Sequence, residues 1–382
     1  MNVFYPKILL ITIVTLKYLP AIQQDERQRW LEYCHDDYAK CPNCFGETIK
    51  SDCDNFLDNV QVERSFDLEV SNLFGNRKIQ YATYDQQNVI LKYLVSDGNF
   101  DHLQSKCCNG SDNCERLWTN KSLVETLKTE LLRVFKTKDN AAGFQICPTD
   151  AVTRFMEVFS DQNIHAWVLL NLNVEPLVVN ALSSRNFSVP TLHGSCGFVT
   201  LQSNNGLPLY SFYDQSFAVR LLIAKNLLSA ALQFSYGVEG FRIYLTDATP
   251  DNIVVDATTF DVTFVDLDDV FVVDSKTFPS SQVVHRHEKI DCDGMCFAYV
   301  PDELCSHHLS DINLFAICQL FIKDLNRMMP DDGLLHSVPD TISRQYPELQ
   351  QLINQCIDGN IDGDRFVSVN LLVDLINKIL FN

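Results

Sequence analysis

The chain of 382 residues is short of positive charge. Its 30 lysines and arginines stand against 49 aspartates and glutamates, which gives a formal net charge of −19. Proteins that bind nucleic acid or anionic membranes need a basic footprint, so neither is an expected partner. The chain also lacks a long apolar run outside its N-terminus, and we expect no membrane contact beyond an N-terminal anchor.

The N-terminus has the proportions of a signal peptide. Lys7 precedes an apolar run, Ile8 to Leu16, that is too short to span a bilayer comfortably. Residues 1–21 are therefore predicted to be a signal peptide cleaved near Ala21 or an uncleaved signal anchor; a buried strand is the remaining alternative. The chain has 14 cysteines, and a content this high fits an oxidising compartment.

All cysteines are disulfide candidates, and the sequence leaves their pairing open. Cys41-Pro-Asn-Cys44 can be half of a zinc site or a redox pair, but disulfides are favoured in an oxidising compartment. Adjacent Cys107 and Cys108 are not expected to bond to each other, because that geometry is strained. The candidates are Cys34, Cys41, Cys44, Cys53, Cys107, Cys108, Cys114, Cys147, Cys196, Cys292, Cys296, Cys305, Cys318 and Cys356; sequons at Asn109, Asn120 and Asn186 allow N-glycosylation.

A strand pair with polar residues at its ends is predicted in the second half of the chain. Ile253–Asp256 and Val262–Val265 are short β-branched runs on either side of a polar turn. A hairpin of this length brings Asn252 close to Asp266. Two such oxygen ligands can hold Mg²⁺ or Mn²⁺ on a nucleotide phosphate, and Asp247 can then take a proton from an attacking hydroxyl. The alternative is that these are ordinary turn residues.

Other segments are predicted to form strands and a helix. Strands are predicted at Phe66 to Val70, Ile79 to Thr83 and Asn88 to Leu94. Phe217 to Tyr236 has apolar residues at helical spacing, which predicts a long amphipathic helix that ends at Gly237.

The pattern resembles the catalytic core of protein kinases, in which Asp-x-x-x-x-Asn precedes a strand, a turn, a strand and a metal-binding Asp. The resemblance implies that Lys92 grips the nucleotide phosphates; the alternative is an edge lysine that reaches water. A helix glutamate would pair with Lys92, and Glu175 fits by order better than its rival Glu125. Asp311 would anchor the catalytic-loop backbone, with a plain helix N-cap as the alternative.

The chain more specifically resembles the divergent protein kinase domain family of the secretory pathway, in the branch called deleted-in-autism-1-like. The likeness covers about residues 40 to 380, and its most specific pieces are Lys40-Cys-Pro-Asn-Cys-Phe-Gly46 and Gly194-Ser-Cys-Gly197. The other pieces are Val89-Ile-Leu-Lys92, Glu175-Pro-Leu-Val178, Asp247–Asn252 with Val265-Asp266, and Asp311 to Leu320. The resemblance implies passage through the endoplasmic reticulum and Golgi, with secretion as a further destination.

The resemblance also implies a fold and a site. The fold is a two-lobed, protein-kinase-like α+β fold with a β-rich N-lobe and a mainly helical C-lobe, stabilised by disulfides. Residues 22–60 would be a cysteine-rich segment, 61–203 the N-lobe with an insertion at about 97–165, and 204–382 the C-lobe. ATP with Mg²⁺ or Mn²⁺ would be the cofactor. Asp247 would be the catalytic base, and Asn252 and Asp266 would bind the metal.

Departures from the kinase pattern leave two functions open. Leu245-Thr246 replaces the usual His-Arg, and Asp268 stands where kinases have glycine, as a second carboxylate that assists a metal or faces solvent. No glycine-rich phosphate loop is present, and Gly75 is the only glycine near the first strands. The first function is a kinase that phosphorylates a secreted protein or glycan. The second is a pseudokinase that acts as a secreted signalling ligand for a receptor or as a luminal scaffold.

Two further motifs are weighed and disfavoured. Residues 358–364 copy the first half of an EF-hand loop, but position twelve is Val369 rather than glutamate. His285, His287, Cys292 and Cys296 can in principle ligate zinc, yet disulfides compete for the cysteines.

Overall fold

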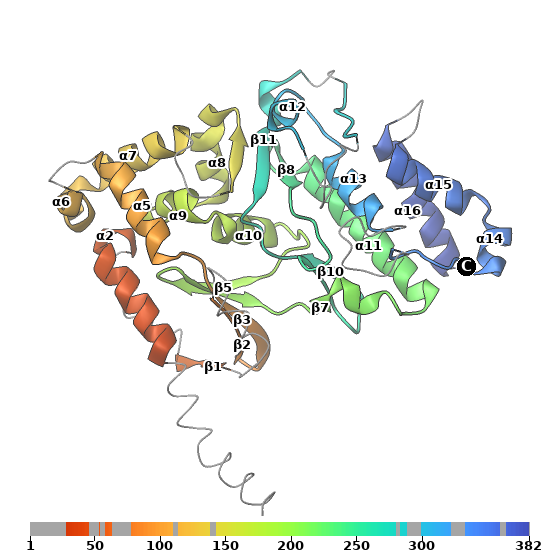
Figure 1. The fold of residues 1–382 in the computed structure, drawn as a ribbon, viewed down its shortest axis with the longest axis horizontal. Helices are drawn as coiled ribbons and strands as arrows, with labels where there is room; N and C mark the ends of the chain where they lie inside the picture. The colour runs from red at the N-terminus through yellow and green to blue at the C-terminus, as the bar shows by residue number, and fades with distance from the viewer. Residues whose placement is uncertain are drawn as a thin grey trace, which may run out of the picture. The chain divides into compact units, whose positions relative to one another are not determined.

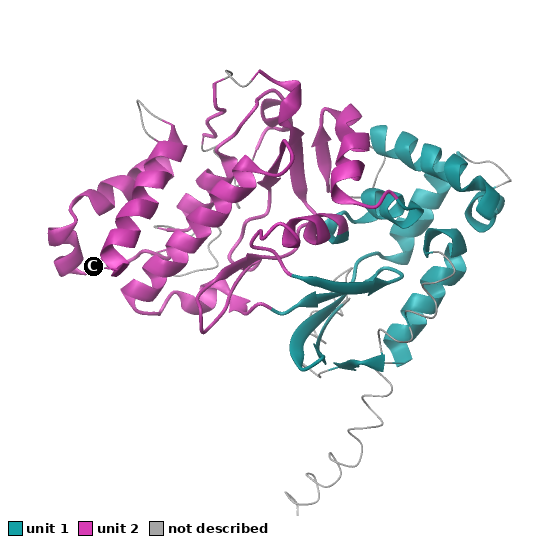
Figure 2. Cartoon of the chain, turned by 180° about the vertical axis from the view of Figure 1, so that it is seen from behind, with its two compact units in different colours: residues 1–141, 163–176, 191–204 teal, residues 142–162, 177–190, 205–382 magenta. Residues whose placement is uncertain are grey.

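A computed structural model of the chain describes residues 28–45, 53, 58–62, 78–109, 114–137, 143–279, 283–288, 299–321, 333–359 and 364–381. The predicted signal segment, the predicted strand at Phe66 to Val70, Gly75, Cys292 and Cys296 lie outside these residues. The chain forms two compact units (Figure 2). Unit 1 comprises residues 1–141, 163–176 and 191–204, and unit 2 comprises residues 142–162, 177–190 and 205–382.

Unit 1 contains a five-stranded antiparallel sheet in the order β1-β2-β3-β6-β5. β2 and β3 correspond to two of the predicted strands and meet at a two-residue turn, Asp85 and Gln86, in which both residues have positive φ. That geometry matches the right-handed twist of a hairpin. The strands are β1 (Val60–Val62), β2 (Lys78–Tyr84), β3 (Gln87–Tyr93), β5 (Leu192–Cys196) and β6 (Val199–Ser203).

The helices of unit 1 bury aromatic side chains. Phe100 packs against Trp118 and Phe198, and Phe45 packs against Phe198. The disulfides Cys41–Cys44, Cys53–Cys196 and Cys108–Cys114 tie this unit together. The helical segments are residues 28–40 (red in Figure 1), α2 (Pro42–Phe45), α5 (Asp97–Cys108), α6 (Cys114–Thr119), η1 (Lys121–Leu123), α7 (Val124–Lys136), α9 (Ile164–Leu172) and the start of α10 (Glu175–Ser183).

Unit 2 is mainly helical and is built on α11 (Phe217–Tyr236), which confirms the predicted long helix. α11 ends at Gly237, whose φ is +66° and where a Cβ atom would collide with the Phe241 carbonyl. The remaining helices are η2 (Thr149–Ala151), α8 (Val152–Phe159), η3 (Leu209–Phe212), η4 (Ser275–Thr277), α12 (Pro301–Cys305), α13 (Ile312–Gln319), α14 (Asp340–Gln345), α15 (Glu348–Asp358) and α16 (Arg365–Phe381).

By length and composition, α11 is apolar enough to cross a membrane, and the bent pair of α9 and α10 passes the same test if it is counted as one span. This corrects the expectation that no run beyond the N-terminus approaches that length. Half of the apolar window of α11 is buried inside the protein. One or two such helices are weak evidence for a membrane span, because the core helix of a soluble protein meets the same criterion.

Two small sheets complete unit 2, in the orders β10-β9-β7 and β4-β11-β8. Residues 142–162 of the predicted insertion belong to this unit because β4 pairs with β11 and Cys147 bonds to Cys305. A second disulfide joins Cys318 to Cys356. The strands are β4 (Gln145–Cys147), β7 (Leu207–Pro208), β8 (Phe241–Leu245), β9 (Ile253–Val255), β10 (Val262–Phe264) and β11 (Val270–Asp274).

Cysteine pairing corrects the sequence analysis at two positions. Cys34 and Cys107, both predicted as disulfide candidates, are buried and form no disulfide with the other cysteines that the structure describes. Cys107 is next to Cys108, which bonds to Cys114 instead, as the strain argument against a Cys107–Cys108 bond requires.

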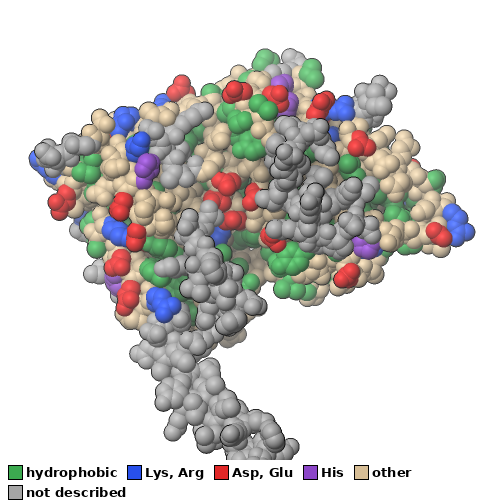
Figure 3. Space-filling model, in the orientation of Figure 1, with side chains coloured by type: hydrophobic (Ala, Val, Ile, Leu, Met, Phe, Trp, Pro, Cys, Tyr) green, Lys and Arg blue, Asp and Glu red, His purple; other side chains and the backbone are tan. Residues whose placement is uncertain are grey.

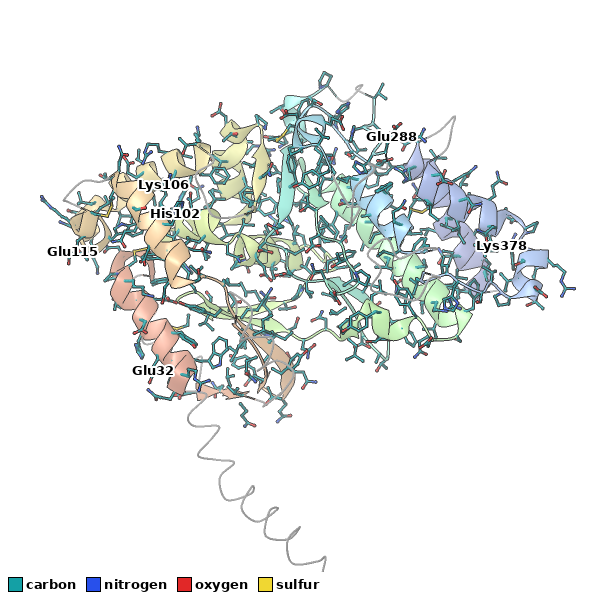
Figure 4. All side chains as sticks on the ribbon, viewed as in Figure 1. Glu32, His102, Lys106, Glu115, Glu288 and Lys378 are labelled. Atoms are coloured by element: carbon teal, nitrogen blue, oxygen red, sulfur yellow. A yellow bond between two sulfur atoms is a disulfide. The ribbon has the colours of Figure 1, made fainter. Side chains whose placement is uncertain are left out.

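Charged side chains on the surface are mixed in sign. On the face drawn in Figure 3, the lysines and arginines that the structure describes lie singly or in small groups among acidic residues. Figure 4 labels His102 and Lys106 on α5 and Glu115 on α6; His102 and Glu115 are exposed. This distribution is consistent with the acidic composition.

Candidate active site

Lys92 and Glu175 form a buried ion pair in unit 1. Lys92 lies on β3 and Glu175 is the first residue of α10. The Lys92 Nζ atom lies 2.8 Å from each oxygen of the Glu175 carboxylate. The Lys92 and Glu175 side chains are 8% and 0% exposed. The rival glutamate, Glu125, is exposed on α7 and contacts Lys128 instead, so Glu175 is the partner of Lys92.

Further side chains surround this ion pair. Gln202 on β6 donates a hydrogen bond from Nε2 to the Glu175 Oε1 atom, at 3.1 Å. The Asn173 side chain accepts the backbone N–H of Glu175 at 3.0 Å. Thr200 is paired with Lys92 in the sheet, so both side chains project from the same face. The Thr200 hydroxyl is buried, and none of the residues that the structure describes forms a hydrogen bond with it.

Asp247 and Asn252 lie together on the loop that follows β8 in unit 2. The Asn252 side-chain amide donates to the Asp247 carboxylate at 2.8 Å and to the Asp247 carbonyl at 3.1 Å. The Thr249 N–H binds the Asp247 carbonyl, and the Asn252 N–H binds the Thr249 carbonyl, so the loop backbone is internally bonded. The Asp247 side chain remains exposed at this turn.

The hairpin predicted from the sequence is formed by β9 and β10. Ile253 pairs with Phe264, and the Val265 N–H donates to the Asn252 carbonyl at 2.9 Å. Asp266 directly follows Val265 and therefore lies at the same end of the hairpin as Asn252. Asp266 has a φ of +60°, a left-handed conformation that is uncommon outside glycine and often marks a functional position.

The local charge changes the acidity of the predicted base. Partial desolvation raises the pKa of the Asp247 carboxyl above the usual aspartate range, and the negative charge of Asp266 raises it further. The amide of Asn252 lowers it, because it stabilises the ionised form. A base with a raised pKa binds a proton more readily, which suits proton abstraction from a hydroxyl.

The segment after Asp266 is also tied to this loop. The Thr246 hydroxyl donates to the Asp269 carbonyl. A Cβ atom at Gly143 would overlap the Asp269 carboxylate, so a larger residue there would require the Asp269 side chain to move. Asp268 is buried at 7% exposure, so of the two alternatives for this carboxylate, the one in which it faces solvent is wrong.

The anchor of the loop is Asn313 rather than Asp311. The Asn313 Oδ1 atom accepts the Leu245 N–H at 2.8 Å, and its Nδ2 atom donates to the Ile243 carbonyl at 2.8 Å and to the Ser235 hydroxyl at 3.1 Å. Asn313 therefore holds the strand that leads into Asp247. Sequence reasoning selected a polar residue at the start of the correct helix but missed this one, two positions later.

Asp311 has a different structural role. It accepts the His287 N–H at 2.7 Å and forms a buried ion pair with Arg365. Arg365 also donates to the Cys356 carbonyl at 2.8 Å. Asp311 thus joins the start of α13 to the start of α16 and to the segment at His287, and its side chain forms no N-cap bond to its own helix.

The other predicted positions are placed as follows. Asn109 and Asn186 are exposed and have positive φ, and Asn120 accepts hydrogen bonds from Ser122 within its own sequon. His285 contacts Ser310 and Glu303. The centre of the EF-hand-like loop, residues 360–363, lies outside the described residues.

The residues fit a metal–nucleotide on two observations. Among the described residues the Thr200 hydroxyl, on the same sheet face as Lys92, has no hydrogen-bond partner, which leaves a hydrogen-bonding position beside the lysine that is predicted to bind phosphate. In unit 2, the amide oxygen of Asn252 and the carboxylate of Asp266 are of the hard type that Mg²⁺ and Mn²⁺ prefer.

These elements define a protein of the protein-kinase class: a strand lysine paired with a helix glutamate, and an Asp-x-x-x-x-Asn loop followed by a hairpin and an aspartate. The family model described as the protein-kinase domain of FAM69 matches residues 166–359. The chain belongs to this family, and its fold is the disulfide-stabilised, protein-kinase-like α+β fold that the sequence predicted.

Relatives agree with the family. The chain is 25% identical over 385 residues to Divergent protein kinase domain 2A of Xenopus tropicalis, covering 90% of this chain and 87% of that protein. It is 24% identical to the Homo sapiens protein of the same name, with the same coverage. Among solved structures, vaccinia related kinase 3 is 15% identical with a TM-score of 0.24; the match covers 51% of this chain and 44% of that one, and at this score it carries no argument.

Proposed function

We propose that this protein is a kinase of the secretory pathway that transfers phosphate from ATP, with Mg²⁺ or Mn²⁺, to a secreted protein or glycan. The observation that carries the proposal is the buried Lys92–Glu175 pair, with Nζ 2.8 Å from both carboxylate oxygens. A buried lysine is costly unless it has a task or a partner. In phosphoryl transfer that task is to hold the nucleotide phosphates.

Each residue has a chemical role in this proposal. Lys92 would bind the phosphates and Glu175 would orient Lys92. Asn252 and Asp266 would hold the metal, which neutralises charge on the phosphates. Asp247 would accept the proton of the attacking hydroxyl while the terminal phosphoryl group passes to that oxygen and ADP leaves.

The proposed location is the lumen of the endoplasmic reticulum or Golgi, or the extracellular space. The disulfides of both units support an oxidising compartment. The signal-like N-terminus and the exposed sequons at Asn109 and Asn186 point the same way. In that location the substrate would be a secreted or luminal protein, or its glycan.

A pseudokinase is the second candidate function, and the loop before Asp247 favours it. Thr246 stands where kinases have arginine, and its hydroxyl is bonded to the Asp269 carbonyl. A secreted ligand or luminal scaffold would need the fold and its surface without phosphoryl transfer.

A thermal-shift titration with ATP, with and without Mn²⁺ or Mg²⁺, separates the two functions. A ligand that binds only the native state stabilises it by about 2.7 kcal/mol at a hundredfold excess over Kd. We expect a metal-dependent shift that disappears in Asp266→Ala. Phosphate transfer to a luminal protein by the wild type, and not by that variant, would complete the case. A folded wild type that shows no shift at millimolar ATP would leave the pseudokinase.

A further inference from the structure

Gln202 is a buried polar residue in the unit 1 sheet. It is 3% exposed on β6, between buried Leu201 and the partly buried Ser203 at the end of the strand. Burying an amide is unfavourable unless its hydrogen-bonding capacity is used. Here the Nε2 group donates to the Glu175 Oε1 atom at 3.1 Å, so the carboxylate of the ion pair provides the acceptor that the buried amide needs.

The register of the sheet makes this contact possible. Gln202 pairs with Ile90, and Thr200 pairs with Lys92. Residues directly opposite in an antiparallel pair, and those two positions along, share one face of the sheet. Gln202 and Lys92 are therefore diagonal neighbours on the face from which both reach Glu175.

Two donors of different charge share one oxygen of Glu175. Its Oε1 atom accepts from Lys92 at 2.8 Å and from Gln202 at 3.1 Å. The lysine is the cation of this group, whereas the amide is neutral and cannot bind a phosphate as a counter-ion. If Lys92 turned partly toward a phosphate, the amide and the Asn173 bond to the Glu175 N–H would still hold the glutamate.

We infer that Gln202 is a positioning residue that fixes the Glu175 carboxylate, so that Lys92 can be shared between Glu175 and the phosphates of a bound nucleotide. The inference rests on the proposed function. It predicts that Gln202 affects binding of the phosphates and not binding of the nucleoside, because the hydrogen bond of its amide leads to Glu175 and through it to Lys92.

The first test compares Gln202→Leu with wild type by measuring the Kd of ATP with Mn²⁺ and the Kd of adenosine. We expect about tenfold weaker ATP binding, the size of one lost hydrogen bond to a charged group, with adenosine unchanged. Gln80→Leu is the matched control. Gln80 is a buried glutamine on β2 that pairs with Leu91 and so projects from the other face of the same sheet. We expect it to change neither constant.

The second test uses Gln202→Glu, which also covers the case in which the leucine variant does not fold. A protonated glutamate has nearly the shape of glutamine and can donate its O–H to Glu175, so ATP affinity should match wild type in acid. As the pH rises the new carboxylate ionises, competes for Lys92, and ATP affinity should fall. Wild type should show no such acid-dependent rescue.

The outcomes separate this inference from the proposed function. If wild type binds no ATP with metal, the proposed function and this inference fall together. If wild type binds ATP and Gln202→Leu binds it equally, or loses adenosine to the same extent, only this inference falls. Parallel pH profiles for Gln202→Glu and wild type would also overturn it alone.

Discussion

The two units carry their polar residues in opposite ways. In unit 1, the Glu175 carboxylate is fully buried and accepts hydrogen bonds from the Lys92 ammonium and the Gln202 amide. In unit 2, Asp247 is exposed on a loop and Asp266 adds a second negative charge near it. In unit 1 the negative charge is neutralised by a lysine of the protein itself. In unit 2 the two carboxylates repel each other unless a cation binds between them. The same change, carboxylate to amide, should therefore have opposite consequences in the two units.

The largest effect is expected for Glu175→Gln. The substitution leaves the Lys92 ammonium buried without its counter-charge, and breaking one side of a buried ion pair costs about 3–5 kcal/mol. Urea unfolding should report that loss in the free energy of unfolding. Glu125→Gln is the control, because that carboxylate is 84% exposed and its contact with Lys128 should be worth less than ~0.5 kcal/mol. Equal stability of the two variants would contradict the central role of the pair in unit 1.

A smaller loss is expected for Asn313→Leu. The leucine would leave the Leu245 N–H and one lone pair of the Ile243 carbonyl without their side-chain partner, at roughly 2–4 kcal/mol. Phosphate transfer should fall with it, because the strand that leads into Asp247 would lose its anchor. Asn354→Leu, at an exposed position of α15, should change the free energy of unfolding by less than ~0.5 kcal/mol. An Asn313 variant with wild-type stability would show that the anchor lies elsewhere.

Local patterns predicted what local physics determines. The β9–β10 hairpin and α11 followed from β-branched runs and helical spacing, because turn and strand chemistry is written in neighbouring residues. Lys92 stood out as a charge inside an apolar strand. These are features that a short window of sequence contains.

Long-range partners could not be read in the same way. Cys53 bonds to Cys196 across 143 positions, and nothing near either cysteine indicates the other. The sequence did not distinguish Asn313 from Asp311. Both are polar residues at the start of one helix, and only the folded structure shows which side chain faces the strand before Asp247. Gln202 carried no signal in the sequence, since a glutamine at the end of a strand gains a role only when Glu175 is placed beside it.

A pH-dependent effect is expected for Asp37→Asn in unit 1. Burial raises the pKa of Asp37 to about 6, although hydrogen bonds from the Phe198 N–H and the Tyr93 hydroxyl oppose the shift. Between the ordinary aspartate pKa of 3.8 and the folded pKa of about 6, the Asp37 carboxyl holds a proton in the folded protein but not in the unfolded chain. Its contribution to stability is therefore full below about pH 4 and is lost as the pH rises through about 6.

The asparagine has no such dependence and can keep both hydrogen bonds, because the Tyr93 hydroxyl can turn to accept. The stability of Asp37→Asn relative to wild type should therefore rise by ~1–3 kcal/mol between pH 4 and pH 7, measured as unfolding free energies across that range. Asp36→Asn, at the exposed neighbouring aspartate, should stay parallel to wild type. A flat difference for Asp37→Asn would mean that its carboxyl is ionised throughout.

The smallest change in stability is expected for Asp266→Asn, and it completes the contrast with Glu175→Gln. Asparagine tolerates a φ of +60° at least as well as aspartate, so the backbone has no reason to move. The substitution also removes a negative charge that raises the pKa of Asp247. The free energy of unfolding should therefore stay within ~0.5 kcal/mol of wild type or increase slightly. Metal-dependent ATP binding should disappear nonetheless, because an amide is a poor substitute for a carboxylate ligand of Mg²⁺. Calorimetric unfolding without ligand and ATP titration with metal measure the two effects separately. A clear destabilisation of the ligand-free variant would show that the Asp266 carboxylate, like that of Glu175, stabilises the protein through contacts within the chain and not through a bound cation.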